Sequence, residues 1–90
     1  MSIRLMLSEL LREYSGGKGI LDVNGNTVAE CLQDLIRQYP LAKKWIFDSE
    51  GRLLVLITKN EESSLINQDR LNTPAKDGDE LFLFMTLGGG

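Results

Sequence analysis

The strongest constraint on the fold is an amphipathic helix whose two ends are both marked in the sequence. Thr27 and Glu30 stand in the S/T-x-x-E relation of a capping box, which predicts a helix beginning at this point. Pro40 ends the helix at about Tyr39. The apolar residues between them repeat at helical spacing and form one stripe: Val28, Cys31, Leu32, Leu35, Ile36 and Tyr39. A helix with a single apolar stripe must bury that stripe against another element of structure.

Alternating segments before the helix predict strands that could cover it. In residues 3–7, Ile3, Leu5 and Leu7 point one way and the intervening residues the other, which is typical of a strand with one buried face. Residues 9–14 predict a short helical turn, and residues 19–23 a second strand that ends at Asn24-Gly25. The two strands are expected to form a hairpin with a long connection.

The second half of the chain predicts further strands. Residues 52–58, RLLVLIT, are apolar in succession, which favours a strand that is covered on both faces or central in its sheet. We expect residues 41–53 to be irregular, with Trp45 and Phe47 over one edge of the core. Residues 65–71 predict a weak edge strand, and residues 81–85 the last strand. The order indicates an α+β domain, in which one main helix packs on a mixed sheet of four to five strands.

Composition excludes several classes of protein. Ninety residues make one small domain, and the net charge of −3 comes with no basic stripe, so nucleic-acid binding is not expected. The longest apolar runs, residues 53–57 and 81–85, are far short of a membrane span, and the first residues lack a secretion signal. A single cysteine permits no internal disulfide, which favours the cytoplasm.

Catalytic side chains are scarce. The chain has no histidine, which removes the usual general base and the commonest neutral metal ligand. Cys31 lies on the helix stripe without cysteine or histidine nearby in sequence, so we expect a small buried hydrophobe and no metal site. Gly16-Gly17 matches no phosphate-binding loop. The sequence therefore predicts a protein that is not an enzyme.

The chain ends on three glycines, directly after its densest apolar run. At a background of about 7% glycine, three in succession at this place occur by chance in roughly one chain in 3,000. A frayed terminus or a linker scar would also look like this, but we favour a functional tail. The segment comprises Gly88, Gly89 and Gly90, and it follows Leu87.

With these motifs the chain resembles the ThiS/MoaD family of ubiquitin-like sulfur carriers. The specific combination is residues 77–80, Asp-Gly-Asp-Glu, before the last strand, together with Gly89-Gly90 at the end. The likeness extends over essentially the whole chain. The length, residues 14–17 (YSGG) and the DLIRQYP helix end are most similar to the members of about 90 residues, which include the carrier used in cysteine synthesis.

The resemblance implies a β-grasp fold over residues 1–87, followed by a flexible glycine tail at residues 88–90. The first and last strands would be adjacent and parallel at the centre of the sheet. It also implies that an activating enzyme, related to ubiquitin activators, adenylates the carboxylate of Gly90 with MgATP. A sulfur donor would then form a thiocarboxylate, which delivers sulfur to a biosynthetic enzyme. The carrier itself would bind no cofactor and would be a monomer when free.

The same resemblance assigns roles near the terminus. Gly88 and Gly89 would thread the tail into the partner's site, because glycine is thin and adopts any φ. Phe84 matches a docking position of the family and would contact partners, although it could instead be plain core. Leu87 would also contact a partner, because little of the domain remains beyond the last strand to bury it. The chain departs from many relatives at Met85 and Thr86, where prolines are common, and at Gly88.

Two other functions stay open. The protein could be a modifier joined through Gly90 to lysines on its targets, as archaeal members of the superfamily can be, or an interaction module with a passive tail. The final sulfur acceptor is equally open: a molybdopterin precursor, the thiamine thiazole, cysteine, methionine or tRNA.

Overall fold

The computed structural model describes residues 2–60 and 65–85 of the chain. The described strands are β1 (Ile3–Leu7), β2 (Ile20–Val23), β3 (Leu56–Lys59) and β4 (Glu80–Phe84). The α-helices are α1 (Glu9–Arg12), α2 (Val28–Gln38) and α3 (Lys43–Ile46). Single 3-10 turns lie at Glu13–Ser15, Pro40–Ala42 and Gln68–Arg70.

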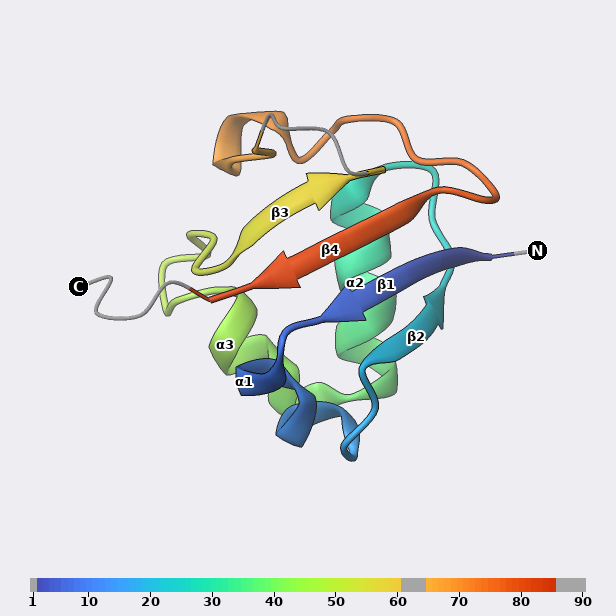
Figure 1. Cartoon of the computed structure of the whole chain (residues 1–90). Coiled ribbons are helices and arrows are strands. Elements are labelled where there is room, and N and C mark those ends of the chain that lie inside the picture. The colour runs from blue at the N-terminus through green and yellow to red at the C-terminus, as the bar shows by residue number, and fades with distance from the viewer. Residues whose placement is uncertain (1, 61–64, 86–90) are drawn as a thin grey trace.

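The four strands form one mixed sheet in the order β2-β1-β4-β3. The central strands β1 and β4 run parallel, with Leu5 opposite Leu81, while β2 and β3 run antiparallel to their neighbours. Figure 1 shows α2 crossing one face of this sheet, behind β4 and β1. The predicted hairpin, the parallel central pair and the α+β fold with one main helix are therefore confirmed.

The ends of α2 lie where the sequence predicts them. The Thr27 hydroxyl accepts a hydrogen bond from the Glu30 amide at 3.2 Å. The Glu30 carboxylate accepts from the Asn26 amide at 2.8 Å, one residue before the amide that a standard capping box would use. Tyr39 caps the other end, and Pro40 opens the following turn. Local signals alone are enough to place this helix.

The apolar stripe of α2 packs on the sheet and forms the core. Val28, Cys31, Leu32 and Leu35 are buried, while Ile36 and Tyr39 at the end of the stripe are only partly buried. The sheet contributes the buried side chains Ile3, Leu5, Leu7, Leu21, Val23, Ile57, Leu81 and Leu83.

The prediction for residues 52–58 is wrong in two respects. The strand begins at Leu56, and it lies at the edge of the sheet instead of being central or covered on both faces. The residues before Leu56 pair with another segment. Leu53 forms an isolated β-bridge with Phe47, and the Leu54 amide donates to the Ile46 carbonyl at 2.8 Å. The apolar residues at the start of this run hold the segment after α3 and do not extend the sheet.

The predicted weak strand at residues 65–71 is not a strand. The Ile66 amide donates to the Ile57 carbonyl of β3 at 2.8 Å, but pairing does not continue along the segment. The Asn67 side chain accepts from the Asp69 amide at 3.1 Å and starts a 3-10 turn at this point. An asparagine cap thus diverts the chain away from β3, so the sheet described here has four strands.

The first part of residues 41–53, expected to be irregular, belongs to the 3-10 turn Pro40–Ala42 and to α3 (Lys43–Ile46). Ile46 of α3 is buried in the core. Trp45 and Phe47 are partly buried against the core, which confirms the predicted position of both aromatic residues over its edge. Helix α3 has only four residues, too few to show the apolar repeat by which a helix is predicted from sequence.

The Asp-Gly-Asp-Glu motif is a clamp that starts β4. The buried carboxylate of Asp79 accepts hydrogen bonds from the Asn60 side-chain amide and the Lys76 backbone amide, both at 3.0 Å. Asn60 has a positive φ of 53° and exchanges further bonds with the backbone of Glu80 at 2.8 Å. Gly78, with φ of 92°, allows the turn. The hydrogen bond from Asn60, followed by that from Lys76, keeps the pKa of Asp79 below its ordinary value although burial opposes this.

Asp79→Asn is expected to destabilise the fold by about 1–3 kcal/mol, because both carboxylate oxygens accept and an amide offers only one acceptor. The exposed Asp77→Asn is the matched control and should be nearly neutral. Since the folded pKa of Asp79 is lowered, its stabilisation is present above the unfolded pKa of about 4 and is lost as pH falls through the lower folded value. Urea unfolding at neutral and acidic pH measures both effects. Equal unfolding midpoints for the two variants would contradict the clamp.

Candidate functional site

The face of the sheet opposite α2, which we call the open face, carries a row of apolar side chains. Strand alternation places Phe82 and Phe84 of β4 on this face, because Leu81 and Leu83 point into the core. The register sets Met6 opposite both Phe82 and Ile20, and Leu56 opposite Phe84. We call these five residues the apolar band: Ile20, Met6, Phe82, Phe84 and Leu56.

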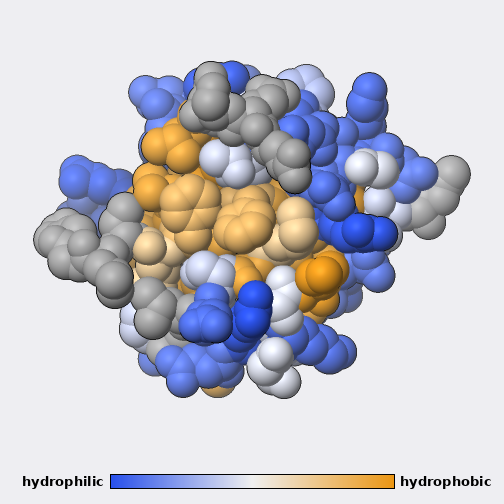
Figure 2. All heavy atoms as spheres, viewed as in Figure 1, coloured by the Kyte–Doolittle hydropathy of each residue, from blue (hydrophilic) through white to orange (hydrophobic). Residues whose placement is uncertain are grey.

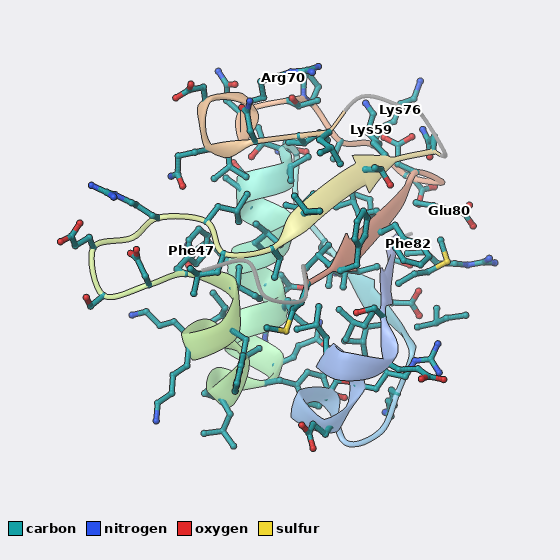
Figure 3. All side chains as sticks on the ribbon, turned by 60° about the vertical axis from the view of Figure 1, so that its left-hand side comes forward. Phe47, Lys59, Arg70, Lys76, Glu80 and Phe82 are labelled. Carbon is teal, nitrogen blue, oxygen red and sulfur yellow. The ribbon has the colours of Figure 1, made fainter. Side chains whose placement is uncertain are left out.

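The apolar band is accessible. Phe82 is 40% exposed and Ile20 58%, while Met6, Phe84 and Leu56 are partly buried. The rings of Phe82 and Phe84 pack edge to face with centroids 5.8 Å apart. Figure 2 shows apolar residues gathered at the centre of the open face with hydrophilic residues around them, and Figure 3 shows Phe82 on the side of β4 away from α2. An accessible apolar surface with a polar surround is a candidate interaction site.

The open face is divided along its strands. At the start of β1 and β4, Arg4 and Glu80 form an ion pair at 3.3 Å, and Asp22 lies opposite Arg4 on β2. The apolar band occupies the other half, toward Phe84, where β4 ends. The accessible apolar surface therefore lies at the end of the sheet from which the chain continues toward its C-terminus.

The predicted site residues fall in two groups. Phe84 lies on the open face, partly buried, and does not belong to the buried core. Leu87, Gly88, Gly89 and Gly90 lie outside the described residues. The assigned roles of all five stay predictions.

Chain length limits how far Gly90 can lie from the apolar band. Gly90 is six residues beyond Phe84. At a maximum of about 3.5 Å per residue, Gly90 lies within roughly 20 Å of Phe84.

Sequence reasoning did not identify Phe82, Met6, Ile20 and Leu56 as site residues. The alternation of residues 80–84 contained the signal for Phe82, since it shares a face with Phe84 and is nearer the middle of the sheet. No comparable signal existed for the other three. They join the band only through the pairing of β1, β2 and β3 around β4.

Cys31 is not available for chemistry. Its side chain is fully buried beneath the sheet, as predicted. Burial, aided by the negative charges of Asp34, Glu30 and Asp79, raises the pKa of the thiol to about 11. The thiol is therefore protonated at neutral pH and is a poor nucleophile.

The described part of the chain has neither a metal-binding cluster nor a membrane-spanning helix. Residues 2–60 and 65–85 hold no group of three or more cysteine, aspartate or glutamate side chains placed to bind a metal ion. Over the same residues, no helix has the length and apolarity needed to cross a membrane.

Comparisons with known proteins connect this fold to small ubiquitin-like proteins. No family model matches the sequence, and no curated protein matches it. Among solved structures, a chain of the BexX/CysO complex of Amycolatopsis orientalis is 24% identical, with a TM-score of 0.83 over 99% of this chain and 100% of its own. SAMP1 of Haloferax volcanii is 26% identical, with a TM-score of 0.82 over all of both chains. A chain of the complex of molybdopterin-converting factor subunits 1 and 2 of Helicobacter pylori is 24% identical, with a TM-score of 0.63 over all of both chains.

These neighbours are small ubiquitin-like proteins of the ThiS/MoaD type, and they match this chain over its full length. The resemblance seen in the sequence and the β-grasp fold are therefore confirmed. Two of the three structures are complexes with another protein.

Proposed function

We propose that this protein is a ubiquitin-like sulfur carrier, and that its working group is the carboxylate of Gly90. The observation that carries the proposal is the full-length match to small ubiquitin-like proteins. In this chain three glycines, Gly88 to Gly90, follow Phe84 of the accessible apolar band by four to six residues. The folded domain would act as the handle by which a partner holds the protein, and the glycine tail as the substrate.

The chemistry follows from the weakness of a carboxylate as an electrophile. An oxygen of the Gly90 carboxylate attacks the α-phosphorus of MgATP, and pyrophosphate leaves. Hydrosulfide supplied by a sulfur donor then attacks the acyl carbon of the adenylate, the bond to AMP breaks and AMP leaves, and a thiocarboxylate remains. The chain has no histidine and its single thiol is buried, so acid–base catalysis and the metal would come from the partner, an adenylating enzyme. The thiocarboxylate would deliver its sulfur to a biosynthetic enzyme serving molybdopterin, thiamine or cysteine synthesis.

The apolar band supports a docking role for the folded domain. Ordering a glycine tail in a narrow site has a large entropic cost, which contacts made by the domain must offset. Phe82 and Phe84 are large aromatic side chains on an accessible face, the type of residue that dominates protein interfaces. In the sequence, Leu87 stands three residues beyond Phe84 and directly before the glycines, so we propose that it contacts the same partner.

A second function is favoured by one of the matches. The Haloferax volcanii neighbour is a small archaeal modifier protein, so conjugation of this chain through Gly90 to lysines on target proteins is the alternative. Both functions begin with the same acyl-adenylate. An interaction module with a passive tail would need neither Gly89 nor Gly90.

Intact mass spectrometry of the protein from its native cell tests the proposal. Replacement of one carboxylate oxygen by sulfur is expected for a carrier, and a series of higher-mass conjugates for a modifier. Deletion of Gly89 and Gly90 should abolish either product. Unchanged mass in the native protein, together with full function of the deletion variant in that cell, would leave only the interaction module.

Phe82→Ala is expected to weaken binding of the folded domain to the adenylating enzyme by about 10- to 100-fold, because it removes an aromatic side chain from the centre of the apolar band. Leu41→Ala is the matched control, since Leu41 is 68% exposed but lies outside the open face, on the turn after α2. Calorimetric titration of each variant with the enzyme measures the change. Equal loss of affinity in both variants would rule out the band as the docking surface.

A further inference from the structure

The outer edge of β2 carries a second feature, which is independent of the glycine tail. In Figure 1, β2 lies at one margin of the sheet, and β1 covers only one of its sides. The Leu7 amide donates to the Gly19 carbonyl at 2.8 Å, which marks a hydrogen-bonded pair of the β1–β2 ladder. By alternation, the backbone groups of Leu21 and Val23 also face β1, while those of Ile20 and Asp22 face outward. Such an edge is a template for the addition of another strand.

Two side chains of α2 reach over this edge. The Gln38 side-chain amide donates to the outward-facing carbonyl of Asp22 at 3.0 Å. The Asp34 carboxylate accepts from the Asn24 backbone amide, just beyond the strand, at 3.0 Å. Gln38 and Asp34 also bond each other at 3.1 Å, and Arg37 binds the other carboxylate oxygen of Asp34. We call Asp34 and Gln38 the edge bracket.

The bracket leaves part of the edge open. Within residues 2–60 and 65–85, no partner beyond the sheet is seen for the outward amides of Ile20 and Asp22 or for the Ile20 carbonyl. The Ile20 side chain beside them is 58% exposed. We call this edge, from Ile20 to Asn24, the binding strip. The edge bracket occupies its Asp22 carbonyl and its Asn24 amide, and leaves the backbone groups of Ile20 accessible.

We infer that this strip is a site for β-strand addition by a second copy of the chain, and that the edge bracket holds it closed. In an antiparallel pairing with its twofold axis at Leu21, Ile20 of one copy lies opposite Asp22 of the other, and both residues present outward-facing groups. Half of the hydrogen bonds in this pairing require the Asp22 carbonyl, which Gln38 occupies. A pairing centred one residue along toward Val23 would require the Asn24 amide, which Asp34 occupies.

The pairing centred on Ile20 is a poor one. Beyond Ile20 it would set Lys18 opposite Asp22, but the Lys18 amide already donates to the Ser15 carbonyl at 3.3 Å, and Gln38 occupies the Asp22 carbonyl. Only Ile20 would then pair with itself across the axis. The edge bracket thus blocks the pairings of two β2 strands that would form several hydrogen bonds. It leaves a pairing that would form only a few. Contacts with other proteins are thereby directed to the open face.

Sedimentation equilibrium of the full chain at neutral pH, up to millimolar concentration, tests the inference. Gln38→Ala frees the Asp22 carbonyl on both copies and should raise the self-association constant by at least about ten-fold. Arg37→Ala is the matched control: it removes the exposed ion pair with Asp34 but keeps both bracket bonds to β2, so it should sediment like the wild type. Gln38 is exposed, so the fold should survive the change, and a thermal melt checks this.

Two further measurements identify the surface. Hydrogen exchange should show added protection of the Ile20 and Asp22 amides in the Gln38→Ala dimer. Adding Ile20→Lys to Gln38→Ala places a charge on the strip and should restore the monomer. If Gln38→Ala and Arg37→Ala sediment alike, the bracket does not restrict the edge and the inference is wrong. Self-association that persists with Ile20→Lys, or that leaves both amides unprotected, places the contact elsewhere and overturns it equally.

Discussion

Gly89→Ala is expected to lower kcat/KM for adenylation by at least about 100-fold, with no change in the free energy of unfolding. The substitution keeps the carboxylate of Gly90 but adds a methyl group where the tail must be narrow, and it penalises positive φ. A displacement of about 1 Å at a reacting group is enough for an effect of this size. Pyrophosphate exchange with the cognate activating enzyme and MgATP measures the rate, and urea unfolding measures the stability.

Extending the chain by one bulky residue past Gly90 should abolish exchange completely, since it moves the carboxylate by about 3.5 Å and gives its residue a side chain. Gln33→Ala, an exposed change on α2, is the control and should be activated like the wild type. If Gly89→Ala and the extended chain are both activated normally, the carboxylate is not the working group and the proposed function fails. The inference about the β2 edge would be unaffected, because it depends on no residue of the tail.

Leu35→Ala is expected to destabilise the protein by about 2–4 kcal/mol, the largest effect on the fold that we predict for a single substitution. Leu35 is 1% exposed and lies on the stripe of α2 that packs on the sheet, so truncation leaves a cavity that the surrounding side chains cannot fill. In a domain of 90 residues, a loss of this size is a large part of the total stability.

Equilibrium unfolding in urea at neutral pH measures this loss. Gln33→Ala on the exposed side of the same helix should change stability by less than about 0.5 kcal/mol. A small effect of Leu35→Ala would mean that the core relaxes around the site, or that the packing face of α2 differs from the one described here.

Local patterns were sufficient to predict the elements whose signals lie within a few residues. The cap at Thr27, the stripe of α2 and the stop at Pro40 each depend on neighbours in sequence. The buried state of Cys31 followed from its place on that stripe. The alternation of residues 3–7 was equally informative, because one face of β1 is buried and the other is not.

Apolar content alone was a poor guide to position in the sheet. Residues 52–58 are as apolar as a central strand, yet β3 is an edge strand and its first predicted residues pair with the segment after α3. Residues 65–71 were predicted as a weak strand from their apolar residues Leu65, Ile66 and Leu71, but the cap at Asn67 turns the chain away from β3. In both places a contact with a distant part of the chain, or a competing local hydrogen bond, overrode propensity.

The sequence by itself determined which helix and strands bury one face, because periodicity and capping are properties of neighbouring residues. Composition alone also identified the glycine segment at residues 88–90 as a candidate functional tail. Only the tertiary structure decided which side chains share a surface. Met6, Phe82 and Leu56 form one band, and Gln38 covers Asp22, because strands far apart in sequence pair in one register and α2 lies across them. A shift of that register by one residue would move each of these strand side chains to the opposite face, so the apolar band and the edge bracket exist only in the folded chain.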